Sequence, residues 1–187
     1  MSKKLTTAEM GRMNVDQYRE ADKLPLVVVL DNVRSQHNVG AVFRTADAMR
    51  IEKVMLCGIC CCPPNQEIHK TALGAEESVE WQYFKETAEA VQTLQAAGYD
   101  VYAVEQAHDS ITLEEFAEKV KGERLKVKGF AVIFGHEVFG VQQEIVDSCK
   151  GCIEIPQYGT KHSMNVSVTA GIVMYRIASS LRLATKK

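Results

Sequence analysis

Short apolar runs alternate along this chain with segments of helical periodicity. Residues 24–30 form a continuous apolar run rich in β-branched side chains, which is typical of a strand covered on both faces. Further strands are expected at 53–57, 79–84, 99–105, 129–134 and 151–155. Helical segments separate several of them, at 87–97, 113–120 and 141–149. This order predicts an α/β fold with a mostly parallel sheet flanked by helices.

The last helical segment, residues 166–183, is apolar nearly all round. Its apolar side chains occupy more than one face: Val168, Ala170, Ile172, Val173, Met174, Ile177 and Leu181. A helix with one face in water does not carry such a pattern. We therefore expect the sheet to bury one side of this helix and a second subunit to bury another, which predicts a homodimer through the C-terminal helix.

Length and composition are those of a single globular domain. At 187 residues with 46% hydrophobic content, the chain can bury a full core. We expect one domain over 1–187, with its core at about 24–183 and residues 1–23 as an N-terminal extension. No apolar stretch reaches the roughly 18 residues of a membrane-spanning helix, and the amino terminus lacks the apolar part of a secretory signal. These features predict a cytosolic (cytoplasmic) protein with no membrane partner.

The net charge of −2 conceals an uneven distribution. Residues 76–118 contain eleven acidic side chains and one basic side chain, Lys85, whereas the rest of the chain has an excess of eight basic residues. A protein binds nucleic-acid phosphates through local cationic surface rather than through its overall charge. The composition therefore does not exclude a nucleic-acid partner. The acidic segment by itself is typical of a solvated face.

Two cysteine pairs have the spacing of zinc half-sites, Cys57 with Cys60 and Cys149 with Cys152. The first pair ends an apolar strand, and the two pairs lie much farther apart than those of a zinc ribbon. Free cysteine behaves as a small buried hydrophobic residue. The sequence therefore predicts structural thiols and no metal site.

Polar residues follow three of the predicted strands. Asn38 and Arg44 follow the first strand, the run 135–140 follows the strand at 129–134, and the run 163–167 follows the strand at 151–155. Ligands of parallel α/β sheets bind at the carboxyl ends of strands, so these runs are candidate site residues. The sequence lacks the glycine patterns of dinucleotide-binding and P-loop proteins. Each run is also compatible with a simple helix cap or turn.

Arg44 belongs to a predicted helix whose apolar stripe is formed by Val42, Ala46 and Met49. It lies about 200° round the helix from Val42, so its side chain points away from the core. Arg44 is therefore available to a ligand. The alternative is an exposed ion pair with Asp47, one turn along the helix.

Three motifs, in this order, resemble those of the SpoU (TrmH-like) RNA ribose 2′-O-methyltransferases of the SPOUT class. They are N-x-G-x-x-x-R-x-A at 38–46, F-G-x-E-x-x-G at 134–140, and I-P at 155–156 followed by S-x-N-V-S at 163–167. Met164 stands where the family usually has leucine, an exchange that keeps volume and apolarity. The resemblance covers residues 24–183, which is nearly the whole chain.

This resemblance implies a deep C-terminal trefoil knot in the α/β fold and a homodimeric assembly. It also implies S-adenosyl-L-methionine as the cofactor, bound in a bent form within the knot and held largely by backbone around Phe134, Gly135, Ile155 and Met164. A glycine at 135 permits close approach of the chain because it has no Cβ. The alternative interpretation of Gly135 is a left-handed turn.

The resemblance assigns catalysis on the ribose 2′-hydroxyl to Arg44. Its guanidinium acts either as a proton acceptor or as a cation that orients a phosphate and stabilises the developing alkoxide. Asn38 and Glu137 are expected to fix the loops by hydrogen bonds. Ser163 and Asn165 are expected to orient Arg44 and the substrate ribose, and Asn165 can also cap the last helix.

The expected function is therefore methylation of a ribose 2′-hydroxyl in tRNA or rRNA, with S-adenosylmethionine as the methyl donor. Two alternatives stay open. One is a catalytically silent RNA-binding or assembly dimer with the same fold, which the intact set of Arg44, Glu137, Ser163 and Asn165 disfavours. The other is a SPOUT enzyme that methylates a base.

Overall fold

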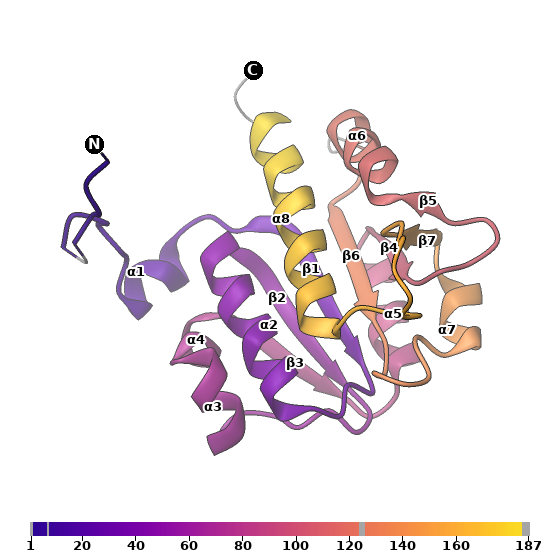
Figure 1. The fold of residues 1–187 in the computed structure, drawn as a ribbon, viewed down its shortest axis with the longest axis horizontal. Helices are drawn as coiled ribbons and strands as arrows, with labels where there is room; N and C mark the ends of the chain where they lie inside the picture. Colours follow the sequence, from indigo (N-terminus) through magenta and orange to yellow (C-terminus); the bar gives the residue numbers. More distant parts are fainter. Residues whose placement is uncertain (1, 7, 124–125, 185–187) are drawn as a thin grey trace.

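The protein is built on one parallel sheet, seen in a computed structural model that describes residues 2–6, 8–123 and 126–184 (Figure 1). Within these ranges the sheet has seven strands in the order β3-β2-β1-β6-β4-β7-β5, and every neighbouring pair is parallel. The strands are β1 (Leu24–Asp31), β2 (Ile51–Cys57), β3 (Trp81–Phe84), β4 (Tyr99–Val104), β5 (Ile111–Thr112), β6 (Gly129–Phe134) and β7 (Gly151–Glu154). The expected α/β class is confirmed.

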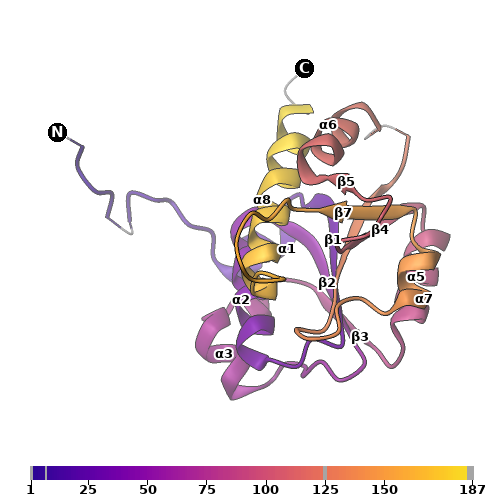
Figure 2. The same cartoon turned by 45° about the vertical axis from the view of Figure 1, so that its right-hand side comes forward.

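Helices cover both faces of this sheet (Figure 2). They are α1 (Val15–Glu20), α2 (Gln36–Met49), α3 (Gln66–Ala72), α4 (Ala75–Ser78), α5 (Thr87–Ala96), α6 (Leu113–Glu123), α7 (Gln143–Ser148) and α8 (Val166–Ala184). Alternate residues of β1 point to opposite faces. Leu26 and Val28 pack in one core with α2, α3, α6 and α8, whereas Val27 and Val29 pack in the other with α5 and α7. Both faces of β1 are therefore buried, as its apolar run predicted.

The structure differs from the predicted elements in several places. Helices α1, α3 and α4 and the short strand β5 were not predicted. Strand β3 begins at Trp81 rather than at 79, because Val79 is the C-cap of α4. Helix α2 begins at Gln36 with Ser35 as its N-cap, so Asn38 lies inside its first turn. Helix α7 begins two residues later than expected, and the other predicted elements are present with small shifts at their ends.

Helix α8 buries one apolar face and exposes another. Its fully buried side chains are Ala170, Val173, Met174, Ile177 and Leu181. Val168, Ile172 and Tyr175 are 53%, 40% and 61% exposed, respectively. Burial of one side of this helix in the core is confirmed, and nothing in the described part of the chain covers the other side. Despite its apolar character, neither α8 nor any other helix of the described ranges is long and apolar enough to cross a membrane.

The parallel order places the carboxyl ends of the strands at one edge of the sheet. The loop after β1 leads from this edge into α2, and the loop after β6 leads into α7. The segment after β7 leads to the amino end of α8 (Figure 1). The three motifs therefore meet at this edge, although more than a hundred positions separate the first motif from the third.

Candidate active site

A cavity of about 630 Å³ lies at the carboxyl ends of β4, β6 and β7. The loops after these strands and the first turn of α8 line it. Seven of the predicted site residues belong to the lining: Phe134, Gly135, Glu137, Ile155, Ser163, Met164 and Asn165. Asn38 and Arg44, both on α2, do not. The four residues expected to bind the cofactor thus share one cavity.

Glu137 connects the second motif to the beginning of α2. Its Oε1 accepts hydrogen bonds from Ser35 N (2.9 Å) and Asn38 Nδ2 (3.0 Å), and its Oε2 accepts one from Arg34 N (3.1 Å). Burial opposes ionisation of this carboxyl, but the backbone donors and the Asn38 amide outweigh burial and lower its pKa. Glu137 is therefore a carboxylate that holds the loop after β1, as expected.

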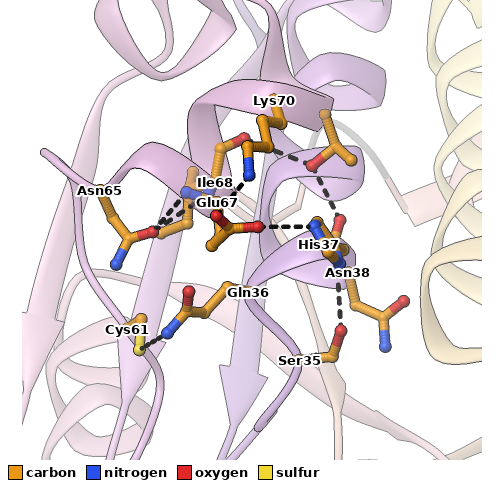
Figure 3. A network of polar contacts seen from close by, with 10 residues as sticks. Ser35, Gln36, His37, Asn38, Cys61, Asn65, Glu67, Ile68 and Lys70 are labelled. Atoms are coloured by element: carbon orange, nitrogen blue, oxygen red, sulfur yellow. Dashed lines mark hydrogen bonds and ion pairs between the residues drawn. The ribbon is translucent and has the colours of Figure 1, made fainter.

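Asn38 connects Glu137 to the third motif. Its Oδ1 accepts a hydrogen bond from Asn165 Nδ2 at 3.2 Å, while its backbone N–H donates to Ser35 Oγ (3.3 Å) at the cap of α2 (Figure 3). Asn165 Oδ1 in turn accepts from Ser167 N (2.9 Å) and Val168 N (3.4 Å) at the start of α8. Asn165 therefore caps α8 and contacts α2 at the same time.

Close packing between α2 and α3 explains the glycine of the first motif. A Cβ at Gly40 would lie 2.2 Å from Thr71 Oγ1 and 2.3 Å from the carbonyl oxygen of Ile68. Around this contact, His37 Nε2 pairs with Glu67 Oε2 at 3.1 Å, as Figure 3 shows. Gly40 thus permits α3 to lie directly against α2, and this packing fixes the amino end of the helix that carries Asn38 and Arg44.

Gly135 is required by the turn that follows β6. A Cβ at this position would lie 2.1 Å from both the carbonyl carbon of Gly140 and the backbone nitrogen of Val141. His136 and Gly140 exchange two backbone hydrogen bonds, of 3.0 and 2.8 Å, which close the turn over Gly135. The close approach predicted for Gly135 is therefore present. The left-handed alternative is wrong for Gly135 and applies instead to Gly140, whose φ is 68°.

Arg44 is exposed on α2, and its side chain makes no hydrogen bond or ion pair with any residue in the described part of the chain. The alternative pairing with Asp47 does not form, since Asp47 Oδ1 accepts from Ser78 Oγ at 2.7 Å. Ser163 is also exposed, and among the described residues neither Ser163 nor Asn165 contacts Arg44. The structure thus joins Asn38, Glu137 and Asn165 and leaves Arg44 and Ser163 available to a ligand.

The cysteines that follow β2 make hydrogen bonds around the loop there. Cys60 Sγ accepts from Val33 N (3.1 Å) and donates to the Leu30 carbonyl (3.3 Å), and Gln36 Nε2 donates to Cys61 Sγ at 3.1 Å (Figure 3). Burial raises the pKa of Cys60 to about 12, so its thiol is neutral at physiological pH. All six cysteines are free thiols, and no group of three or more metal-ligating side chains occurs in the described ranges.

Two acidic residues of the cavity were not predicted as site residues. Glu105 and Glu154 belong to the lining. Glu105 directly follows β4, and Glu154 is the last residue of β7. The rule that places ligands at strand ends, applied to every strand, would have found both.

The SpoU rRNA Methylase family model matches residues 25–175 of this chain. The chain belongs to this family. The SpoU chain is 30% identical over 178 residues to the 23S rRNA (guanosine-2′-O-)-methyltransferase RlmB of Vibrio parahaemolyticus, covering 95% of this chain and 68% of that protein. It is 28% identical over 167 residues to the tRNA (guanosine(18)-2′-O)-methyltransferase of Thermus thermophilus, covering 89% of this chain and 81% of that protein.

Other relatives are longer than this SpoU chain. A putative TrmH family tRNA/rRNA methyltransferase of Staphylococcus saprophyticus is 28% identical over 163 residues, which are 87% of this chain and 62% of that protein. The chain thus spans slightly less than two thirds of the length of several relatives that it matches.

Solved structures share the fold of the SpoU chain. The A. aeolicus TrmH/SpoU tRNA modifying enzyme superposes with a TM-score of 0.76 at 24% identity, covering 90% of this chain and 83% of that one. The AdoMet-bound rRNA methyltransferase from Sinorhizobium meliloti gives a TM-score of 0.73 at 24% identity, covering 87% and 59%. The predicted family and its enzyme class, S-adenosylmethionine-dependent RNA 2′-O-methyltransferase, are confirmed at the level of the family, which also implies the SPOUT knot.

Proposed function

We propose that this SpoU protein transfers the methyl group of S-adenosylmethionine to a ribose 2′-oxygen of a tRNA or rRNA. The observation that carries the proposal is the bridge from Glu137 through Asn38 to Asn165, which ties the three family motifs together beside one cavity. The names of the relatives support the same reaction, since RlmB acts on 23S rRNA and the Thermus thermophilus enzyme acts on tRNA.

The cavity suits S-adenosylmethionine. Phe134, Ile155 and Met164 supply apolar lining, and the turn at Gly135 brings backbone close to the cavity because no Cβ intervenes. Bound there, the cofactor would supply an electrophilic methyl group on a sulfonium. These residues hold and orient a ligand, so much of the rate comes from positioning.

Arg44 then acts on the RNA. Its guanidinium has no partner among the described residues, and a free arginine is a permanent cation with donors matched to a phosphate. We therefore assign Arg44 the electrostatic role of orienting a phosphate and stabilising the developing 2′-alkoxide, rather than the role of a base. Ser163, exposed at the cavity, donates to the ribose, while Asn38, Glu137 and Asn165 hold the three loops in place.

A methyl-transfer assay tests the proposal. The purified protein is incubated with methyl-labelled S-adenosylmethionine and unmodified tRNA or rRNA, and label is located in dinucleotides that resist alkaline hydrolysis. We expect such label in the wild type and a loss of roughly 10²–10³-fold in Arg44→Ala, the scale of removing one group that stabilises transition-state charge. Cofactor binding should persist in Arg44→Ala because Arg44 does not line the cavity.

The same assay separates the two alternative functions. A catalytically silent RNA-binding dimer gives no transfer with any RNA, and a base methyltransferase gives label that is released by alkali as mononucleotides. Arg44→Lys keeps the charge but loses the planar fork of donors, so it should recover only part of the activity. Transfer undiminished in Arg44→Ala would overturn the role assigned to this residue.

We also propose a homodimeric assembly and a cytosolic location for this protein. The exposed apolar face of α8, at Val168, Ile172 and Tyr175, supports a homodimer through this helix, because a second copy would bury it. We also propose that the chain acts as one catalytic domain with its core at 24–183, and that it works in the cytosol, where its RNA substrates occur.

A further inference from the structure

Carboxylates line the cavity, and no lysine or arginine of the described residues accompanies them. The carboxylates are those of Glu105, Glu137 and Glu154. Arg44 lies outside it on α2. The cavity is therefore an anionic site, although its apolar residues and backbone turns would serve a neutral ligand equally well.

The three carboxylates differ in how many hydrogen bonds they accept from other residues. Glu137 accepts three hydrogen bonds that tie it to the beginning of α2. Glu105 accepts one from Gln106 N (3.0 Å) and one from Val141 N (3.1 Å), which orient the carboxylate without supplying a counter-ion. The side chain of Glu154 makes no hydrogen bond or ion pair with any residue in the described part of the chain. Glu105 and Glu154 thus present uncompensated charge to the cavity.

The two forms of the cofactor differ in charge at one atom. S-adenosylmethionine carries a sulfonium, an ammonium and one carboxylate, so its net charge is positive. S-adenosylhomocysteine, which is left after the methyl group departs, has a neutral thioether in place of the sulfonium and no net charge. A negative lining therefore distinguishes substrate from product even where their shapes are nearly the same.

We propose that Glu105 and Glu154 make the cavity selective for the cationic cofactor over its neutral product. The inference rests on the proposed function and adds two specificity-determining residues to it. Methyl transfer removes the positive charge, so the same carboxylates that favour binding of the methyl donor no longer favour retention of the product. The lining thereby promotes exchange of product for fresh cofactor.

The expected effect of one carboxylate is moderate because the cavity is partly open to solvent. A unit charge about 10 Å from the sulfonium, at an effective dielectric constant of about 20, changes affinity by about tenfold. Salt reduces this contribution, because the Debye length at physiological ionic strength is about 8 Å.

Binding of three ligands to matched variants tests the proposal. Calorimetry gives the Kd of S-adenosylmethionine, S-adenosylhomocysteine and sinefungin, an analogue with an ammonium near the sulfonium position, for the wild type, Glu154→Gln and Glu105→Gln. We expect the two cationic ligands to bind about tenfold more weakly to each variant, with S-adenosylhomocysteine changed less than twofold. High salt should weaken binding of the cationic ligands to the wild type more than to either variant.

Two controls keep the outcome decisive. Glu89→Gln makes the same charge change on the exposed surface of α5, so it should leave all three Kd values unchanged. Glu105→Gln places an amide N–H₂ against Gln106 N or Val141 N, so it loses a hydrogen bond, whereas Glu154→Gln loses none with a described residue. Glu154→Gln is therefore the cleaner test, and its fold is checked by urea unfolding.

Equal weakening of all three ligands, or no weakening of the cationic pair in Glu154→Gln, would overturn the proposal. Either result would leave the proposed function intact, provided that the wild type still transfers label to RNA. Absence of transfer by the wild type, with the charge-dependent pattern of affinities present, would instead reject the proposed function and keep the selectivity for a cationic ligand.

Discussion

The side-chain amide of Asn165 donates a hydrogen bond to Asn38 Oδ1 at 3.2 Å across 127 positions of sequence. Asn38 uses its own amide nitrogen to donate to Glu137, so a single side chain joins the first, second and third motifs. Asn38 is only 9% exposed, so both bonds are partly buried. This relationship explains why asparagine is suited to position 38, since the residue must donate and accept at the same time.

Replacing Asn38 should damage both stability and catalysis. Asn38→Ala removes an acceptor from Asn165 and a donor from Glu137, so we expect a loss of about 1–3 kcal/mol in the free energy of unfolding, measured in urea. The rate of methyl transfer should fall as well, because the loops after β1 and β7 lose the hydrogen bonds that connect them.

Asn14→Ala is the matched control for Asn38→Ala. Asn14 is the exposed N-cap of α1 and lies outside the three motifs. Its removal should cost about 1 kcal/mol of stability, which is typical of a lost cap, and leave methyl transfer unchanged. Equal losses of transfer in the two variants would contradict the connecting role of Asn38.

Because of Glu137, the free energy of unfolding should depend on pH. Its pKa in the folded protein is lowered from the ordinary 4.5, because hydrogen bonds from Ser35, Arg34 and Asn38 outweigh its burial. A lowered folded-state pKa contributes stability above the unfolded-state value, and this contribution is lost as the pH falls through the folded-state value. Glu137→Gln should therefore be less stable than the wild type at pH 7, and the difference should shrink below about pH 4.5.

Denaturant unfolding at several pH values measures the effect of Glu137→Gln. The exposed Glu89→Gln is run alongside, and it should differ little from the wild type at any pH. A gap between Glu137→Gln and the wild type that stays constant from pH 7 to pH 3 would show that its carboxylate charge is not what holds the loop.

Gly135→Ala tests the turn that follows β6. Its new Cβ would meet backbone atoms of Gly140 and Val141 at 2.1 Å, and backbone cannot move aside as a side-chain end can. We expect a loss of about 1–3 kcal/mol of stability, together with weaker cofactor binding because the turn lines the cavity. In contrast, Gly159→Ala meets nothing within 4 Å and should be close to neutral in unfolding experiments. Similar behaviour of the two variants would argue against a special role of Gly135.

The exposed face of α8 should control assembly. We expect the wild type to sediment as a dimer and Ile172→Glu with Tyr175→Glu to sediment as a monomer, because two charges would be buried without partners. Leu73→Glu is the control, since Leu73 is 63% exposed and lies in the short segment between α3 and α4 rather than on α8. A monomeric wild type, or a double variant that remains dimeric, would contradict the proposed interface.

Much of the fold could be predicted from periodicity. The run at 24–30 is apolar at every position, and it forms the interior strand β1 with both faces buried. Helices α3 and α4 were missed because they are short and much of their burial comes from packing against α2, as the contact of Gly40 with Ile68 and Thr71 shows. Such packing leaves little periodicity in a segment of four to seven residues.

The sequence identified most residues of the site but not the contacts between them. The motifs identified Asn38, Glu137 and Asn165, yet Ser163 and Asn165 were expected beside Arg44, and Asn165 contacts Asn38 instead. Glu105 and Glu154 were overlooked because no motif contains them, although both stand at strand ends. Which strand ends become neighbours depends on the order of strands in the sheet.

The sequence by itself determined the α/β class, a first strand buried on both faces, the apolar last helix and the three motifs of the family. These properties follow from local periodicity and from residue types at fixed spacing. Only the tertiary structure decided that Glu137 accepts from Ser35 and Asn38, that Asn165 reaches Asn38, and that two further carboxylates line the cavity. Those contacts join residues about a hundred positions apart, and hydrogen bonds form only where the order of strands brings donor and acceptor to within about 3 Å.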